Sequence, residues 1–316
     1  MVQLKPTNRG PKISFKVGRY FLALSTTDEL IERELIDRLS TNPNAELDLG
    51  DLPRRKWLHD TLGGSDPVCC GAFRSAAVGI NTLVVFFDKD EDNDGESKGF
   101  YFFGNPRSGK VATYPYFFNV VPSGMFQPTV FPREPKREFR IKHSFLREYF
   151  EELYDAEEVR KSKGRGHANH FYRKGPVKRL LKRLKSNNSK VRAELYFTGL
   201  CVNLLTLRPD ICTLLLIRDG DWYDEEGSDS RDEDGHIYSI KLSDEYLVDE
   251  PSHLKELFDK LGVDKLKIRV PLNERLEVIQ PDRLGPHNML PPAAAFIGLG
   301  LRVARQKLGI CPKTGR

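Results

Sequence analysis

Residues 146–153 read Leu-Arg-Glu-Tyr-Phe-Glu-Glu-Leu, and their spacing predicts a helix with two different faces. Apolar side chains recur at i, i+3, i+4 and i+7, which gives a helix one apolar stripe for packing. This stripe consists of Leu146, Tyr149, Phe150 and Leu153. The opposite face has three carboxylates at i, i+3 and i+4, namely Glu148, Glu151 and Glu152. The stretch therefore predicts a packed helix that presents a carboxylate cluster.

The three carboxylates allow two interpretations. Like charges three and four residues apart on a helix repel one another. A hard divalent cation such as Mg²⁺ (or Mn²⁺) removes that repulsion, and Mg²⁺ prefers oxygen ligands, so Glu148, Glu151 and Glu152 are candidate metal ligands. The alternative is a solvated acidic face on which Arg147 pairs with Glu151. Because short motif matches are common, the helix by itself favours this alternative.

The segment that precedes the helix makes the region resemble the Nudix hydrolase superfamily. A strand-like run, residues 114–121, leads through Pro122-Ser123-Gly124 into a loop and then into the acidic helix. The box of that family has an opening Gly, a Glu six residues later, and then R-E-U-x-E-E-x-G-U, in which U is bulky and aliphatic. The residues that match it are Gly124, Arg147, Glu148, Tyr149, Glu151 and Glu152.

The chain departs from the family pattern in three ways. Gly124 lies 23 positions before the Arg of the box, where the family has 14, so the loop is 9 residues longer. Val130 stands at the position of the loop Glu, and Glu134 and Glu138 are the candidates to replace it. Tyr154-Asp155 replaces the Gly that follows the glutamate pair. These departures favour a binding module, whereas the intact run of residues 147–153 favours an enzyme.

The resemblance implies both a fold and a reaction. The family fold is an α/β/α sandwich around a mixed β-sheet, and the reaction is hydrolysis of a nucleoside diphosphate linked to another moiety. By analogy, Glu148, Glu151 and Glu152 hold Mg²⁺, which neutralises phosphate charge and orients the attacking water. Glu148 would help to deprotonate that water, and Arg147 would orient the glutamates by charge-assisted hydrogen bonds. The alternative is a degenerate module that binds a nucleotide metabolite or nucleic acid as a sensor or regulator.

Strand-like and helix-like runs alternate along the chain, which independently predicts an α/β fold. The predicted strands are residues 13–24, 80–87, 100–103, 114–121, 193–206, 211–217 and 264–270. The predicted helices are residues 28–39, 147–154, 251–261 and 292–308. Pro, Gly and Asp favour a connector over residues 42–66, a turn at 208–210 and an exposed acidic loop over 219–234. We expect an N-terminal strand-helix extension over residues 1–72 and the Nudix-like domain over 73–316.

Two other stretches resemble ligand-binding loops. Residues 104–110 fit G-x4-G-K, but Val111 stands where a P-loop needs Ser or Thr, and the following residues look β-like rather than helical. A basic hairpin loop is the better interpretation, in which Arg107 and Lys110 contact a substrate phosphate. Residues 88–95 resemble the start of an EF-hand loop, but Tyr101 replaces its twelfth-position Glu. An exposed hairpin tip is therefore expected there.

Charge is concentrated in residues 160–192, which contain 13 Lys and Arg and no Asp or Glu. The whole chain of 316 residues has a net charge of only +5, so the rest of the chain sums to −8. Leu180, Leu181 and Leu184 give this segment a helical apolar stripe, and Phe171 and Tyr172 add aromatic rings. Such a run can bind nucleic acid through phosphate contacts with counterion release. The alternative is a solvated basic insertion.

Composition excludes several classes of protein. No apolar run approaches the ~18 residues of a membrane helix, so we expect no membrane partner. The first residues lack the apolar core of a signal peptide, and the five cysteines are odd in number and have no framework spacing. The chain also lacks the G-x-S-x-G motif of a serine hydrolase. We therefore expect a cytoplasmic protein, and no feature of the sequence indicates its oligomeric state.

Overall fold

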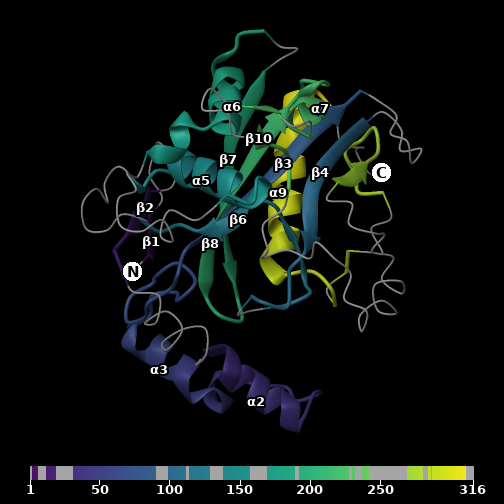
Figure 1. Cartoon of the computed structure of the whole chain (residues 1–316). Coiled ribbons are helices and arrows are strands. Elements are labelled where there is room, and N and C mark those ends of the chain that lie inside the picture. Colours follow the sequence, from purple (N-terminus) through teal and green to yellow (C-terminus); the bar gives the residue numbers. More distant parts are fainter. Residues whose placement is uncertain are drawn as a thin grey trace. The chain divides into compact units, whose positions relative to one another are not determined.

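The computed structural model divides the chain into two units, whose elements are shown in Figure 1. The first unit comprises Met1–Gly79 and Leu200–Asp210, and the second comprises Ile80–Gly199 and Ile211–Arg316. The segment Leu200–Asp210 thus belongs with the N-terminal residues, although it is distant from them in sequence. The structure describes residues 2–5, 12–18, 31–89, 99–111, 114–128, 138–156, 169–188, 192–227, 230–231, 237–241, 269–279, 284–285 and 287–310.

A seven-stranded mixed sheet organises most of the chain. Its strands are β3 (Gly79–Asp88), β4 (Gly99–Pro106), β5 (Phe118–Val120), β6 (Ser123–Met125), β7 (Ala193–Asn203), β8 (Arg208–Ile217) and β11 (Arg269–Leu272). The order is β11-β4-β3-β8-β7, with β5 paired to β4 and β6 paired to β3. Antiparallel ladders join β4 to β3, β5 and β11, so that Phe102 lies opposite Val85 on one side and Val270 on the other.

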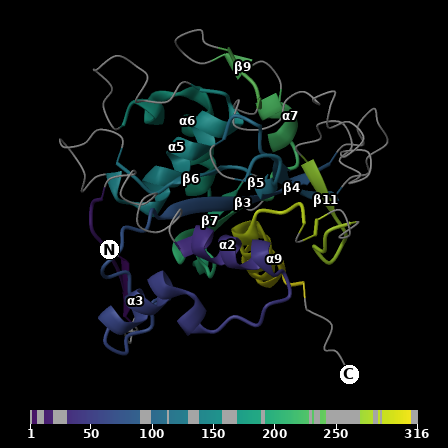
Figure 2. The same ribbon diagram turned by 90° about the horizontal axis from the view of Figure 1, so that it is seen from below.

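Helices cover both faces of this sheet (Figure 2). Helices α5 (Ile141–Leu153) and α6 (Gly175–Lys185) lie over one face, and α9 (Pro291–Leu308) lies over the other. The smaller elements are the 3-10 helix η3 (His170–Arg173), α7 (Trp222–Gly227), β9 (Ser230–Arg231) and β10 (Ile237–Tyr238). Two helical layers around one mixed sheet form an α/β/α sandwich, which confirms the predicted fold class.

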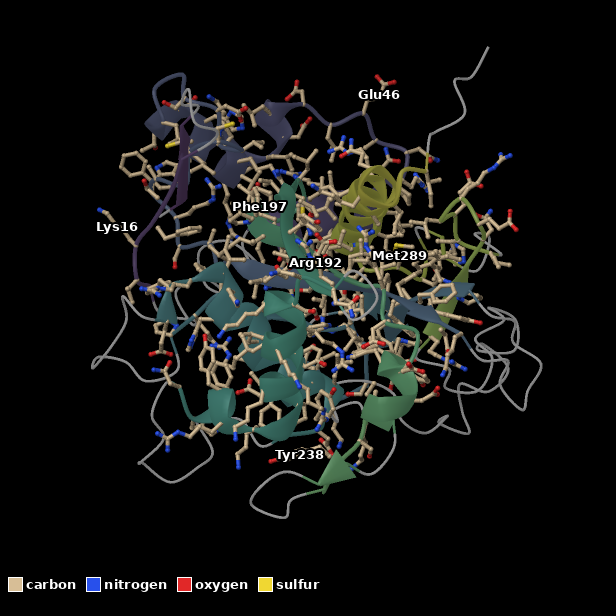
Figure 3. The ribbon with its side chains drawn as sticks, turned by 90° about the horizontal axis from the view of Figure 1, so that it is seen from above. Lys16, Glu46, Arg192, Phe197, Tyr238 and Met289 are labelled. Atoms are coloured by element: carbon tan, nitrogen blue, oxygen red, sulfur yellow. The ribbon has the colours of Figure 1, made fainter. Side chains whose placement is uncertain are left out.

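Particular residues determine where helix α9 begins and ends and how closely its backbone approaches the sheet. Pro291 begins the helix, where its fixed φ and missing N–H cost nothing, and Gly309 ends it with a left-handed φ of 71°. Met289, labelled in Figure 3, precedes the helix and bridges to Phe118 of β5. A Cβ on Gly300 would meet the Leu83 side chain at 2.6 Å, so the glycine lets the helix backbone approach β3 closely.

The first unit contains two α-helices, of which the sequence predicts one, α2, and misses the other, α3. Its elements are β1 (Val2–Lys5), β2 (Lys12–Phe15), α2 (Arg33–Thr41), η2 (Leu49–Asp51) and α3 (Pro53–Thr61). The prediction of a connector over residues 42–66 is wrong, because α3 lies within it. Pro53 starts α3, the Glu34 carboxylate accepts hydrogen bonds from the backbone N–H groups of Arg54 (2.7 Å) and Arg55 (3.3 Å), and Leu58 is buried. These contacts outweigh the turn-forming composition.

Other predicted boundaries shift for identifiable reasons. The turn predicted at residues 208–210 lies instead at 204–207, and Pro209 is tolerated near the start of β8. Part of the acidic segment 219–234 forms α7, because Trp222 is fully buried against Phe86 and Phe103. In the run 114–121 only β5 is a strand, since Tyr114 and Tyr116 have positive φ. The helix predicted over 251–261 lies outside the described residues. So do half of the strand predicted over 13–24, which begins within β2, and residues 264–268 of the strand predicted over 264–270.

No helix among the described residues has the length and apolar character needed to cross a membrane.

Candidate carboxylate site on helix α5

Helix α5 is buried on nearly all of its surface. The predicted apolar stripe is confirmed, since Leu146, Tyr149, Phe150 and Leu153 are all buried. The face opposite this stripe is not solvated, however, because Glu148 is only 8% exposed and Glu152 only 5%. The alternative of a solvated acidic face is therefore wrong for Glu148 and Glu152, although the Arg147–Glu151 pair that it predicted is present at 3.7 Å. Charges that leave water need partners, so the contacts of these carboxylates decide what the site can do.

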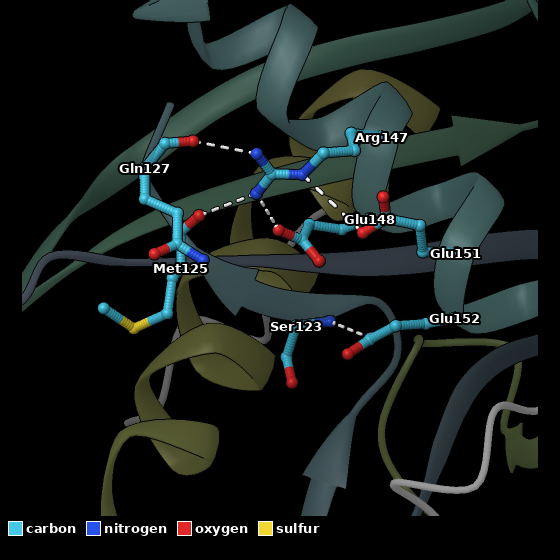
Figure 4. Close-up of polar contacts among 7 residues, drawn as sticks. All are labelled: Ser123, Met125, Gln127, Arg147, Glu148, Glu151 and Glu152. Atoms are coloured by element: carbon cyan, nitrogen blue, oxygen red, sulfur yellow. Dashed lines mark hydrogen bonds and ion pairs between the residues drawn. The ribbon is translucent and has the colours of Figure 1, made fainter. Parts of the chain in front are cut away.

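Arg147 is the partner at the centre of the cluster (Figure 4). Its guanidinium is 2% exposed, and it donates hydrogen bonds of 2.8 Å to the backbone carbonyl oxygens of Gln127 and Met125. It also pairs with Glu148 and lies 3.7 Å from an oxygen of Glu151. The planar guanidinium suits this arrangement, because its five N–H groups form a rigid fork. Arg147 thus ties the helix to the segment after β6 and orients two of the three glutamates.

The opening of β6 holds the remaining side of the cluster. The backbone N–H of Ser123 donates a 2.5 Å hydrogen bond to Glu152 Oε2. A Cβ on Gly124 would overlap the carboxyl group of Glu148, so only glycine leaves room for that carboxylate. The structure therefore brings Gly124 against the box helix although the loop between them is 9 residues longer than in the family pattern. Glu148 and Glu152 thus both contact the start of β6.

Glu138 is a fourth carboxylate near the cluster. It is 1% exposed, and with Glu148 and Glu151 it acts on the pKa of Arg147. Burial by itself would lower that pKa, but the three carboxylates outweigh burial and raise it. Arg147 is thus charged at every physiological pH. Glu134, the other candidate for the missing loop Glu, lies outside the described residues.

His143 lies one helical turn before Arg147 and is held without charge. Its Nδ1 is 3.2 Å from the Tyr172 hydroxyl, and its ring packs against Phe171. Burial first, and then the nearby charges of Arg147 and Arg140, lower the pKa of His143 to about 4, although Glu138 acts in the opposite direction. The histidine is a neutral link between α5 and the η3 segment.

The donor set has the chemistry that Mg²⁺ requires. Glu148 and Glu151 pair with one guanidinium and Glu152 with a backbone N–H, so the three carboxylates exceed the positive charge of Arg147. Each carboxylate offers oxygen ligands. The missing side chain of Gly124 leaves room for the Glu148 carboxyl group itself, which a Cβ at this position would overlap. Within the described segments, no group of three or more Asp, Glu, His or Cys residues is already arranged as a metal site. A bound ion would therefore have to draw carboxylate oxygens away from Arg147 and Ser123.

The two predicted phosphate-binding residues occupy a different part of the sheet. Arg107 follows β4, where its backbone pairs with Phe117 and Tyr116, and Lys110 is exposed in the turn beyond it. On the same ladder, Val121 pairs with Phe103, four residues earlier, or about 13 Å along the strand. Residues 104–110 form a strand end and a turn with no helix after them, so they are not a P-loop. Contact of Arg107 and Lys110 with phosphate stays a prediction.

The described part of the basic segment consists mainly of η3 and α6, and both contact α5. Helix α6 buries Val177 and Leu180, while Lys178, Lys182 and Lys185 are exposed. Arg183 does not belong to the exposed set, because it forms a 2.9 Å ion pair with Asp219 and both side chains are largely buried. The segment is thus a packed element with a basic outer face. Residues 160–168 lie outside the described chain.

Comparisons with known proteins add little to this geometry. No protein-family model matches the chain, and no curated protein matches it. Among solved structures, the chain is similar to the crystal structure of a NUDIX hydrolase from Alicyclobacillus acidocaldarius, at 12% sequence identity over 76% of this chain and 100% of that chain, with a TM-score of 0.30. A likeness of this size assigns no residue and no activity, so the function has to be argued from the site itself.

Several contacts of the site have no sequence signal. Met125 and Gln127 take part through backbone oxygens, and Ser123 through its N–H group, so their side-chain types say nothing about their roles. Asn119, which donates a 2.8 Å hydrogen bond to Ser123 Oγ, is a buried amide in an otherwise apolar strand. That isolated polar residue is the one signal that could have identified it from the sequence.

Proposed function

We propose that this protein is a Mg²⁺-dependent, Nudix-type hydrolase of a nucleoside diphosphate linked to another moiety. The single observation that supports this most strongly is the set of three glutamates on one turn of α5, of which Glu148 and Glu152 are buried and Glu148 and Glu151 pair with one buried guanidinium. Such a cluster concentrates negative charge beyond what Arg147 neutralises, at a cost in desolvation that a purely structural helix has no need to bear. A divalent cation offsets that charge, and a diphosphate is the substrate class whose own charge such a cation offsets in turn.

In this proposal the side chains of the cluster have separate roles. Glu148, Glu151 and Glu152 hold the ion, which when bound neutralises phosphate charge and orients water. Glu148 accepts a proton from the attacking water. Arg147 keeps Glu148 and Glu151 in position through its ion pairs with them. Ser123 and Gly124 supply backbone rather than side chain: one N–H for Glu152 and an open space for Glu148.

A catalytically degenerate module that binds a nucleotide metabolite is the second candidate. It is favoured by the engagement of Glu148 and Glu151 with Arg147 and by the lack of a ready three-ligand group in the described segments. In this case the same carboxylate site recognises a nucleotide without cleaving it. The exposed lysines of α6 extend this candidate to nucleic acid.

Hydrolysis is tested with a panel of nucleoside diphosphates linked to sugars, nucleosides or alkyl groups. The enzyme is expected to release a nucleoside monophosphate from at least one of them with Mg²⁺ and not with EDTA. Glu151→Gln and Glu152→Gln should each lower the rate by 10²-fold or more, because each removes a charged ligand. Glu274→Gln, at an exposed position, is the matched control and should leave the rate unchanged. Activity that survives both substitutions would sink the assignment.

The nucleic-acid extension is tested separately by the salt dependence of binding. Phosphate contacts make log K fall linearly with log salt, by about 0.7–0.9 for each contact. Replacement of Lys178, Lys182 and Lys185 by Gln should flatten that slope by about 2–3. A slope that is already flat in the unaltered protein would exclude backbone contact by this helix.

A further inference from the structure

The strand that leads into the carboxylate site buries an amide with an unused acceptor. Asn119 of β5 is 2% exposed, and its Nδ2 donates to Ser123 Oγ at 2.8 Å. Its Oδ1 is buried and accepts no hydrogen bond from any residue in the described chain. A buried polar atom without a partner costs free energy, so such an atom needs an explanation beyond packing.

The position of this amide connects it to the site. Ser123, which receives the Asn119 hydrogen bond, donates its own N–H to Glu152. Two hydrogen bonds therefore lead from the amide of β5 to a carboxylate of α5. The unused Oδ1 belongs to the same amide group as the Nδ2 that bonds to Ser123, so it lies within a few ångströms of the Ser123 hydroxyl.

The surrounding sheet confirms that polarity here is unusual. Asn119 lies opposite Asn105 in the β4–β5 ladder, and both are buried. Two residues earlier on the same face of β4, Phe103 packs against Trp222 and Tyr223 in an aromatic cluster. This face of the β4–β5 ladder thus changes from aromatic at Phe103 to amide at Asn105 and Asn119. Burial of a polar group costs free energy that burial of an apolar side chain does not, so the amides favour recognition over stability.

We propose that Asn119 Oδ1 accepts a hydrogen bond from an O–H or N–H group of the ligand that occupies the carboxylate site. This inference rests on the proposed function, because it requires that the site bind a metal ion and a nucleotide. An acceptor next to carboxylates does not suit phosphate oxygens, which are also acceptors. The donor is therefore either a water molecule held by the metal ion or a hydroxyl or N–H group of the nucleoside.

The substitution Asn119→Leu tests the proposal, because it keeps the size of the side chain and removes both amide functions. Two affinities are measured for the full-length protein: that for Mn²⁺ alone by paramagnetic resonance, and that for α,β-methylene nucleoside diphosphates with Mn²⁺ by calorimetry. We expect a loss of about 3- to 10-fold, the size of one hydrogen bond. A loss in both affinities identifies the donor as metal-held water. A loss only for the nucleotide places the donor on the nucleoside.

Two further variants separate this effect from a fault in folding. Asn119→Asp keeps an acceptor at the same position, so it should bind Mn²⁺ at least as well as the unaltered protein. Thr213→Val removes a buried hydroxyl that bonds to Thr82 elsewhere in the sheet, and it should leave both affinities unchanged. A similar loss in Thr213→Val would show a general effect of buried polar groups and overturn the proposal.

The outcomes also distinguish this inference from the proposed function. Unaltered protein that binds neither Mn²⁺ nor any nucleotide overturns both. Binding that is equal in Asn119→Leu and in the unaltered protein overturns the role of Asn119 and leaves the hydrolase assignment intact. Binding that weakens in Asn119→Leu, in a protein with no hydrolytic activity, supports the role of Asn119 while the hydrolase assignment fails.

Discussion

Helices α5 and α9 cover opposite faces of the same sheet, but they bury different chemistry. The buried residues of α9 are all apolar: Ala293, Phe296, Ile297, Gly300, Leu301 and Ala304. Helix α5 buries ten of its thirteen residues, and these include His143, Ser144, Arg147, Glu148 and Glu152. One face of the sheet is therefore closed by packing alone, whereas the other is closed by a network of charges. The difference shows that a buried helix can be part of a core and still hold reactive groups.

The largest difference between the two helices is expected in the free energy of unfolding when an arginine side chain is replaced. Arg147→Met removes the guanidinium that pairs with Glu148 and Glu151 and that donates to the carbonyl oxygens of Met125 and Gln127. Breaking a buried pair in this way costs about 3–5 kcal/mol. Urea unfolding at pH 7 measures the loss, with Arg302→Met on the exposed side of α9 as the control, for which less than about 0.5 kcal/mol is expected. A loss below 1 kcal/mol in Arg147→Met would mean that the network is not stabilising.

The second difference is a dependence on pH that only α5 should show. The pKa of His143 is about 4 in the fold and 6.5 in its absence, so between these values the unfolded chain binds a proton that the fold does not. The contribution to stability is complete above pH 6.5 and is lost as pH falls to 4, by an amount of the order of 1–3 kcal/mol. Unfolding free energies of His143→Gln and of the unaltered protein should therefore converge over this range. The exposed His287→Gln is the control, and parallel curves for His143→Gln would contradict the prediction.

Two glycines provide the third comparison, one for each face. In Gly124→Ala the added Cβ displaces the Glu148 carboxylate, so we expect weaker Mn²⁺ binding together with a loss of stability of about 1–3 kcal/mol. In Gly300→Ala the Cβ meets the Leu83 side chain, which can shift, so stability falls by about 1–2 kcal/mol and Mn²⁺ binding does not change. Calorimetry with Mn²⁺ and thermal unfolding distinguish the two. Equal Mn²⁺ affinity in both variants would show that Glu148 is not a ligand.

The smallest expected change in stability comes from Gly298→Ala on α9. A Cβ on Gly298 would meet nothing within 4 Å, so Gly298→Ala should stabilise the protein by about 0.5–1 kcal/mol through helix propensity alone. The same measurement of thermal unfolding detects it. Destabilisation by Gly298→Ala would indicate a contact of α9 beyond the described residues.

The candidate site was predictable where side-chain type and spacing determine it. The spacing of Leu146, Tyr149, Phe150 and Leu153 predicted the buried stripe of α5, and the motif match selected the charged residues and Gly124. Whether the glutamates lie in water or in the interior could not be predicted, because burial depends on what covers the second face. The sequence also could not decide whether Glu134 or Glu138 replaces the missing loop Glu, because the spacing of residues in a loop does not determine where their side chains lie.

The sequence by itself determined the α/β class, the closing helix and the carboxylate helix, because hydrophobic periodicity and terminal Pro or Gly are local properties of the chain. Only the tertiary structure decided that α3 forms within a Pro-rich segment, that Trp222 draws an acidic stretch into the core, and that Gly124 lies against Glu148. The physical reason is the same in each case. Burial of one side chain and a hydrogen bond from a distant backbone group are worth more than local propensity, and neither partner can be identified until the chain is folded.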